Sequence, residues 1–176
     1  RSARHVAFFR KAGRPGQARR IIEGMLRPEV VEIPMEYPVT TEISLHDSAY
    51  NTCLSAFYAE CTAKLKALAE SGEDVIVLCE GDPFFYGSFM YVYQRLAGSY
   101  DCEVVPGVSS IMMGAAVSGI PLAARNDVLT IIPGPLPDDE MRGRVEASDA
   151  LVIMKVGRHL PRIRALLSEM GLLNKA

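Results

Sequence analysis

Long apolar runs, a large charge of one sign and clusters of metal-ligating residues are all missing from this sequence of 176 residues. The longest apolar runs, such as Val75–Cys79 and Ala150–Met154, have five residues, whereas a helix that crosses a bilayer needs roughly 20. The 19 lysines and arginines nearly balance the 21 aspartates and glutamates, which leaves a net charge of −2. These absences exclude a membrane-spanning protein and a general binder of nucleic acids or other polyanions.

Cysteine and histidine are scarce and scattered along the chain. The four cysteines form no Cys-x-x-Cys pair, and the three histidines lie far apart in the sequence. Neither a zinc site nor a disulfide framework is therefore predicted. The charged Arg10 and Lys11 follow the first apolar residues too soon for the apolar region of a secretory signal. We expect a cytoplasmic protein that binds no metal.

The sequence has the composition of a soluble globular protein, with 49% apolar and 23% charged residues. Short apolar or β-branched segments alternate with segments of helical period, which is typical of βαβ units and an open, mostly parallel sheet. The predicted strands are residues 5–9, 30–35, 75–79, 102–105, 128–132 and 150–154. The predicted helices are residues 17–26, 48–71, 87–97, 109–118, 138–146 and 159–170.

Two features of this pattern predict how the elements are arranged. Residues 75–79 are apolar at every position, which is typical of a parallel strand covered by helices on both faces. The stretch 121–127 is a connector and predicts a boundary between an N-terminal α/β domain, residues 1–121, and a partial C-terminal α/β domain, residues 127–176. The second domain has two predicted strands, too few to bury a sheet alone, so we expect either that it continues beyond Ala176 or that the sequence is a fragment.

The segment Glu80–Ser88 is the first that could bind a ligand, because it joins an apolar strand to a helix. Ligands of open α/β sheets bind at the carboxyl ends of strands, and a glycine such as Gly81 lets the backbone approach them closely. The segment matches neither G-x-x-x-x-G-K-[ST] nor G-x-G-x-x-G. The carboxylates of Glu80 and Asp82 would repel a phosphate but suit ribose hydroxyls, an ammonium or a sulfonium. A turn in which Asp82 caps the next helix is the alternative interpretation.

Two further segments follow predicted strands. Pro106–Ser110 precedes a helix that Ser109 or Ser110 could cap, and capping alone would explain these residues. The small residues Gly114–Ala116 of that helix are typical of close helix packing. Ile153–Arg158 follows a strand of the second domain, where Met154 would either contact a ligand or belong to the core.

Taken together, these segments resemble the tetrapyrrole methylase family. The resemblance extends over about residues 6–167 and is carried by Glu80–Ser88, Val105–Ser110, Gly119–Leu122 and Ile153–Arg158. Members of this family transfer methyl groups from S-adenosylmethionine to corrin precursors and related macrocycles. The sequence is most similar to the members that methylate precorrin-2 at C(20), which gives precorrin-3A in cobalamin (vitamin B12) biosynthesis.

The resemblance implies two α/β domains with S-adenosylmethionine in the cleft between them, and a homodimer. The residues that match the family's cofactor contacts are Gly81, Asp82, Phe85, Ser109, Ser110 and Met154. The macrocycle carries many carboxylates, and the candidates to bind it are Tyr86, Arg125, Lys155 and Arg158. The alternative for Tyr86 is an aromatic residue of the core. The alternative for the three cationic residues is a solvated surface charge. Two parts of the family have no counterpart in this sequence: the opening strand with its glycine-rich turn, and the closing strands of the second domain. We expect activity to need the opening segment as well as the closing strands.

We assign no catalytic base, because the sequence contains no Ser/His/Asp or Cys/His arrangement and the transfer depends mainly on positioning. Two other functions stay open. A cobalt-dependent anaerobic counterpart would methylate cobalt-factor II at the same carbon. A non-catalytic module would use Gly81 and Ser109 to bind a regulatory nucleotide, and a purely structural role is a further, weaker alternative.

Overall fold

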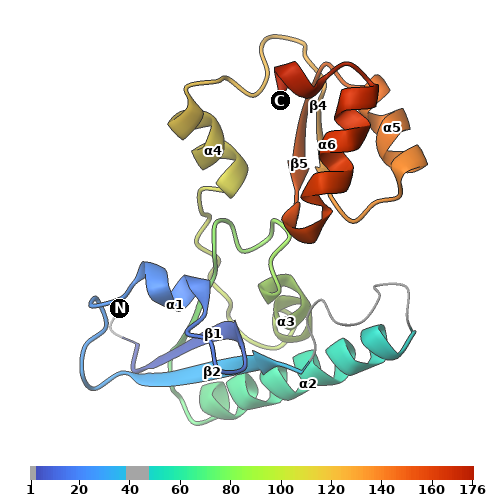
Figure 1. Ribbon diagram of the computed structural model, residues 1–176. Coiled ribbons are helices and arrows are strands. Elements are labelled where there is room, and N and C mark those ends of the chain that lie inside the picture. Colours follow the sequence, from blue (N-terminus) through green and yellow to red (C-terminus); the bar gives the residue numbers. More distant parts are fainter. Residues whose placement is uncertain (1–2, 39–47) are drawn as a thin grey trace. The chain divides into compact units, whose positions relative to one another are not determined.

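The computed structural model describes residues 3–38 and 48–176, which belong to two compact units, residues 1–109 and 110–176 (Figure 1). Each unit has its own parallel sheet and its own hydrophobic core. Within the described ranges, no helix combines the length and the apolar character that crossing a membrane requires.

The sheet of the first unit has the strand order β2-β1-β3. The central strand is β1 (His5–Lys11), which pairs in parallel with β2 (Val31–Tyr37) on one side and with β3 (Val75–Leu78) on the other. Because the strands are parallel, their carboxyl ends lie at the same edge of the sheet. That edge is where the loop after β3 begins.

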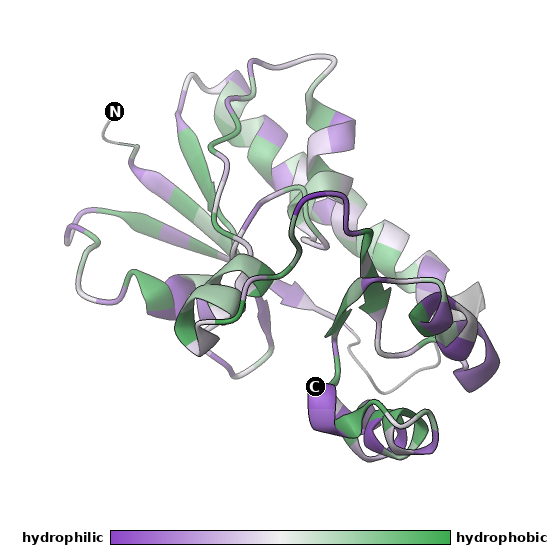
Figure 2. Cartoon of the chain, turned by 90° about the horizontal axis from the view of Figure 1, so that it is seen from above, coloured by the Kyte–Doolittle hydropathy of each residue, from purple (hydrophilic) through white to green (hydrophobic). Residues whose placement is uncertain are grey.

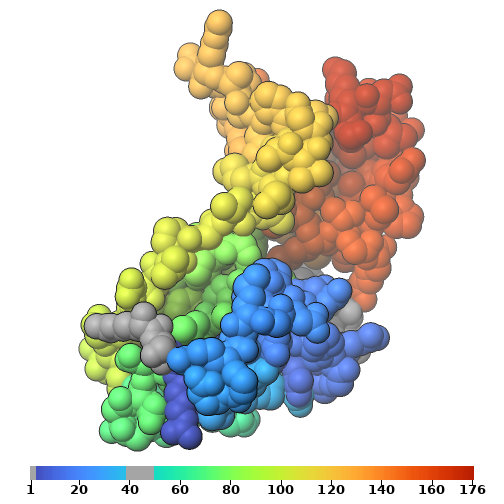
Figure 3. All heavy atoms as spheres, turned by 90° about the vertical axis from the view of Figure 1, so that its left-hand side faces the viewer, coloured from blue at the N-terminus to red at the C-terminus, as the bar shows by residue number. Residues whose placement is uncertain are grey.

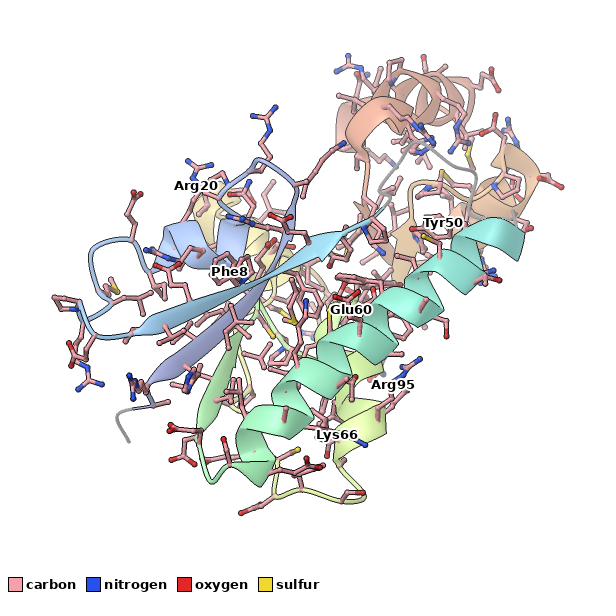
Figure 4. All side chains as sticks on the ribbon, turned by 90° about the horizontal axis from the view of Figure 1, so that it is seen from below. Phe8, Arg20, Tyr50, Glu60, Lys66 and Arg95 are labelled. Carbon is pink, nitrogen blue, oxygen red and sulfur yellow. The ribbon has the colours of Figure 1, made fainter. Side chains whose placement is uncertain are left out.

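Helices lie on both sides of this sheet (Figures 1 and 4). On one face α2 (Ser48–Glu70) and α3 (Phe89–Leu96) lie side by side, and on the other face lies the short α1 (Gln17–Ile21). Alternate residues of β1 face opposite sides, so Ala7 belongs to the core under α2 whereas the buried Phe8 lies next to Gly16 at the start of α1. The buried core under α2 consists of Ala7, Met35, Phe57, Tyr58, Cys61, Leu65, Val92 and Leu96.

The second unit is built on the parallel pair β4 (Leu129–Pro133) and β5 (Ala150–Met154). This pair is coloured green, and so hydrophobic, in Figure 2. The helices α5 (Asp138–Glu146) and α6 (Leu160–Glu169) supply the rest of the core, which consists of Ile132, Met141, Val145, Ile163, Leu166 and Leu167. Two short 3₁₀ helices complete the unit, η1 (Gly157–His159) and η2 (Leu173–Lys175).

The helix α4 (Ser110–Ser118) opens the second unit and lies at the surface, where Figure 3 shows it in yellow. Ile111 is buried, but Met112, Met113 and Val117 are more than half exposed. The helix is therefore apolar on most sides without being a core helix of its unit.

The α/β class with parallel strands is confirmed, and so are most of the elements. The predicted strand 150–154 and helix 138–146 have the same bounds as β5 and α5. The other strands and helices with a counterpart differ from the prediction mainly at their ends. These elements have strong local signals, such as Pro137 before α5 and the unbroken apolar run of β5.

The predicted strand at residues 102–105 is wrong, since these residues have no regular structure. Cys102 packs against the core of the first unit, but Val105 is 71% exposed. Within the part of the chain that is described, β3 pairs with β1 alone, so the segment 102–105 has no neighbouring strand to hydrogen-bond. A β-branched segment becomes a strand only when such a neighbour is available.

Two further predictions, the length of the first helix and the covering of β3 on both faces, are wrong because too little apolar surface is in contact there. The predicted helix 17–26 ends at Ile21, and 3₁₀-like turns follow, because Ala18 is the one residue of α1 that is buried. β3 is covered on one face, where Val75 and Val77 pack against the core, whereas Ile76 on the other face is 44% exposed. Within the described residues, α1 is the helix on that second face of the sheet, and it packs mainly on β1 rather than on β3.

The compact units divide between Ser109 and Ser110, N-terminal to the predicted boundary at 121–127. The difference concerns α4, which is grouped with β4 and β5 rather than with the first sheet. The domains 1–121 and 127–176 of the complete protein stay a prediction.

Candidate functional site

The loop between β3 and α3, Glu80–Ser88, is folded by its own polar groups and is called the β3 loop below. The Phe84 N–H donates to Asp82 Oδ1 at 2.9 Å, and the Phe85 N–H donates to the Asp82 carbonyl at 3.2 Å. Gly81 has a φ of +65°, which L residues other than glycine rarely adopt. Asp82 therefore closes a tight turn at the carboxyl end of β3.

Asp82 also joins the β3 loop to the segment that precedes α4. Its Oδ2 accepts a hydrogen bond from the Gly107 N–H at 3.0 Å. The two backbone hydrogen bonds, from Gly107 and from Phe84, lower the pKa of Asp82. The carboxylate is thus held in its charged form, and the link between the loops weakens as the pH falls through that lowered pKa.

Gly107 is needed at this contact because the two backbones approach closely. A Cβ atom at residue 107 would collide with the carbonyl oxygen of Gly81 and would lie 2.8 Å from its carbonyl carbon. The structure therefore brings Gly81 and Asp82 together with Gly107 in the first unit. The sequence pattern included Gly107 in a candidate segment, but the close approach that requires glycine there is visible only in three dimensions.

Aromatic side chains occupy the middle of the β3 loop. The Phe84 ring stacks on Phe89 at 6.2 Å between centroids and meets Tyr93 edge-on at 4.8 Å. Phe85 meets Tyr86 in a T-shaped arrangement at 4.9 Å. Tyr86 has a φ of +55°, an uncommon conformation for a residue with a side chain. Phe85 and Tyr86, predicted to contact cofactor and macrocycle, thus lie side by side.

Cys79, which precedes the β3 loop, has no properties of a nucleophile. Burial raises the pKa of its thiol to about 11, and the nearby carboxylates of Asp82 and Glu80 contribute to the rise. The thiol is therefore protonated near neutral pH, whereas nucleophilic cysteines react as thiolates.

A groove of about 400 Å³ in the second unit brings together three other predicted residues. Ser110 at the start of α4 lines one part, and Met154 and Lys155 at the end of β5 line another. The remaining lining comes from Ile111, Gly114, Ala115, Ser118, Ile120, Leu122, Val152 and Ile153. The lining is mostly apolar with a few polar groups, and the groove is largely open to solvent.

The small residues of α4 do not serve close helix packing in this unit. A Cβ atom built on Gly114 meets no atom of the described residues within 4 Å, and Gly114 and Ala115 line the groove. Their small size keeps the groove open. The sequence pattern showed a small-residue helix but did not show which surface it borders.

The end of β5 is held by a short hydrogen bond. The Gly134 N–H donates to the Met154 carbonyl at 2.6 Å, and Lys155 follows with a φ of +55°. Arg125 has a φ of +51° and lies in a turn closed by the Asp127 N–H, which donates to the Ala124 carbonyl at 3.0 Å.

The candidate residues are thus divided between the units. Gly81, Asp82, Phe85, Tyr86 and Ser109 belong to the first, and Ser110, Arg125, Met154, Lys155 and Arg158 belong to the second. Arg158 is exposed and lies in η1, next to the end of β5.

Comparison with known proteins shows what the chain resembles. The family model described as Tetrapyrrole (Corrin/Porphyrin) Methylases matches residues 1–175. A Sinorhizobium protein named Precorrin-2 C(20)-methyltransferase is 44% identical over 171 residues, which are 97% of this chain and 70% of that protein. The Cobalamin biosynthesis protein CobIJ of Mycobacterium bovis is 40% identical over 159 residues, which are 90% of this chain but 31% of that protein.

A solved structure has a similar fold. The crystal structure of the methyltransferase CobJ superimposes with a TM-score of 0.56 over 96% of this chain and 76% of that chain. Its sequence identity of 14% means that this likeness concerns the fold alone.

Proposed function

Because the chain belongs to the tetrapyrrole methylase family, we propose that it acts as a methyltransferase that transfers the methyl group of S-adenosylmethionine to C(20) of precorrin-2, giving precorrin-3A. The observation that carries the proposal is the 44% identity, over nearly the whole chain, with a protein named for this reaction. The two-unit α/β fold and the polar loops at the strand ends support it.

The residues of both units suit S-adenosylmethionine. The acidic β3 loop offers Glu80 and Asp82 to hydroxyl groups and to positive charge, and Gly81 leaves its backbone accessible. Phe85 provides an aromatic surface, and the open groove beside Met154 offers apolar side chains for a ligand to pack on. We assign Gly81, Asp82, Phe85, Ser109, Ser110 and Met154 to the cofactor.

The proposed chemistry depends on positioning. S-adenosylmethionine supplies an electrophilic methyl group on a sulfonium. The chain's own task is to orient the electron-rich carbon of the macrocycle in line with that methyl group and to exclude water. Such positioning can lower a barrier by about 7–11 kcal/mol without an acid or a base. The protonated Cys79 agrees with a site that uses no protein nucleophile.

Cationic and aromatic side chains are proposed to bind the macrocycle. Lys155 lines the groove of the second unit, and Arg125 and Arg158 are exposed in the same unit. Guanidinium groups bind carboxylates with two parallel hydrogen bonds, which suits a ring with many carboxylate side chains. Tyr86, which is 41% exposed, presents a ring that could cover one face of the macrocycle.

The experiment that tests the proposal offers precorrin-2 and cobalt-factor II in parallel, with labelled S-adenosylmethionine, to the complete protein. We expect label to enter precorrin-2 at C(20) with the higher kcat/KM. Preference for the cobalt-bearing ring would assign the protein to the anaerobic reaction instead. Absence of transfer to either ring, together with binding of S-adenosylhomocysteine, would indicate a non-catalytic nucleotide-binding module.

We propose in addition that the complete protein is a homodimer in the cytoplasm. The expectation comes from the family resemblance, and light scattering on the complete protein tests whether it is a homodimer. A monomer at working concentrations would contradict it. Fractionation of cells that express the complete protein tests whether it is cytoplasmic.

A further inference from the structure

The hydroxyl group of Ser88, at the end of the β3 loop, lies between two tyrosine hydroxyls. Ser88 Oγ is 2.5 Å from the Tyr37 hydroxyl, and the Tyr58 hydroxyl donates to it at 3.1 Å. Ser88 directly precedes α3, where a serine commonly caps the helix, yet its side chain makes no capping hydrogen bond. The hydroxyl instead joins the loop to β2, which carries Tyr37, and to α2, which carries Tyr58.

The two tyrosines are fixed by the aromatic core around them. Tyr58 is buried and its ring stacks on Tyr91 at 4.8 Å, whereas Tyr37 contacts Phe57 at 5.2 Å and Phe9 at 5.7 Å. Burial raises the pKa of both tyrosines, so both hydroxyls stay neutral and can donate a hydrogen bond. Buried hydroxyls need a partner, and Ser88 serves both.

The β3 loop is therefore held at two points. Near its start Asp82 is bonded to Gly107, and at its end Ser88 is bonded to Tyr37 and Tyr58. Between these points lie Phe85 and Tyr86, which leave the loop toward solvent with part of their surface exposed. Tyr37 is the last residue of β2, so the hydroxyl network joins the carboxyl end of β2 to the end of the loop that follows β3. Ligands of open α/β sheets bind at such carboxyl ends.

We propose that Tyr37, Tyr58 and Ser88 are positioning residues for the cofactor: they act through the β3 loop, whose backbone and Phe85 they keep in the conformation that binds S-adenosylmethionine. This inference rests on the proposed function, because it names residues that support the same site. A loop held at Asp82 alone would sample other conformations, so only a fraction of the molecules would have the loop conformation that binds the cofactor. The apparent affinity falls in proportion to that fraction.

The test uses the complete protein with S88A, Y37F and the double variant, each compared with the wild type. We expect Y37F, which removes one part-buried hydrogen bond, to weaken binding of S-adenosylhomocysteine, measured by calorimetry, by about tenfold. S88A removes the hydrogen bonds to both tyrosines and should weaken binding at least as much. We also expect the KM for S-adenosylmethionine to rise more than the KM for the tetrapyrrole, because the β3 loop carries Gly81, Asp82 and Phe85 for the cofactor but only Tyr86 for the macrocycle. Because Tyr37 and Ser88 share one hydrogen bond, the double variant should lose less than the sum of the two single variants.

Two further variants separate positioning from general stability. Tyr100 donates its hydroxyl to Glu70 Oε1 at 2.8 Å, so Y100F removes an exposed tyrosine hydrogen bond elsewhere in the unit and should leave both KM values unchanged. S88T retains the hydroxyl and should restore the affinity lost in S88A. Unchanged affinity in folded S88A and Y37F would overturn the inference, as would equal rises of both KM values. Failure of the wild type to bind S-adenosylhomocysteine would instead overturn the proposed function.

Discussion

At the scale of single residues, the site depends on where backbone groups can meet. Asp82 is the clearest case, because one carboxylate closes the turn of its own loop and accepts a hydrogen bond from a second loop. The structure thus gives Asp82 a role in building the site, in addition to the contact with the cofactor that we propose. Both roles need the charged form, which the two N–H groups stabilise.

Replacing Gly107 with alanine tests this arrangement. The new Cβ atom would collide with Gly81, and relieving the overlap would push the two loops apart. We expect G107A to destabilise the first unit by about 1–3 kcal/mol, the usual range for overpacking, and to weaken binding of S-adenosylhomocysteine. Urea unfolding and calorimetry on the complete protein provide the two measurements.

The matched control is G98A. A Cβ atom at Gly98 meets no described atom within 4 Å, and this glycine has no positive φ. We expect its stability and affinity to equal those of the wild type. Equal losses of stability and of S-adenosylhomocysteine affinity in G107A and G98A would show that the close approach between the loops contributes to neither.

At the scale of the elements, each helix and strand exists because it has a surface to pack on. The strand β5 and the helix α5 share a core with α6, whereas α1 ends early where its apolar residues find no partner. Met141 on α5 is fully buried and belongs to the core of the second unit, so its side chain shows how much this packing contributes.

Truncating Met141 to alanine should destabilise the second unit by about 2–5 kcal/mol, because a large buried side chain is lost and a cavity remains. Hydrogen exchange followed by mass spectrometry should show that M141A exchanges faster than the wild type in β4, β5, α5 and α6. Exchange in β1, β2 and β3 should increase less. The control is M25A, since Met25 is 75% exposed and its removal should leave exchange unchanged. Uniform acceleration across both units in M141A would contradict separate cores.

At the scale of the whole molecule, the chain consists of two units with separate cores, and the residues that we propose for the cofactor come from both units. The predicted boundary of the complete protein at 121–127 and the observed division after Ser109 differ in the placement of α4. Both segments are mostly exposed, but the turn in residues 121–127 is local, whereas the segment before α4 is joined to the β3 loop by the hydrogen bond from Gly107 to Asp82.

Limited proteolysis with a protease of broad specificity should therefore cut first within residues 119–127, leaving a fragment in which α4 stays with the first unit. Mass spectrometry of the early fragments identifies the cut. First cleavage within residues 103–109 would place the boundary before α4 instead. A D82N variant provides the control, since weakening the Gly107 link should expose the segment before α4 to the protease.

Local patterns were sufficient to predict most elements and the candidate segments. Glycine, proline and polar residues at the ends of apolar runs predicted the β3 loop and the end of β5, where Tyr86 and Lys155 have the uncommon left-handed conformation. The same patterns wrongly predicted a strand at 102–105, because a strand needs a partner that no local pattern can supply. They also could not show that Ser88 bonds to Tyr37, since these residues lie far apart in the sequence.

The α/β class, the family and the segments where chemistry is expected could all be inferred from the order of residues, since periodicity and short motifs depend on neighbouring residues. Tertiary structure alone decided which of these segments meet: Asp82 with Gly107, Ser88 with Tyr37 and Tyr58, and Ser110 with Met154 and Lys155 around one groove. The reason is physical, because such contacts depend on how strands and helices pack across long stretches of chain.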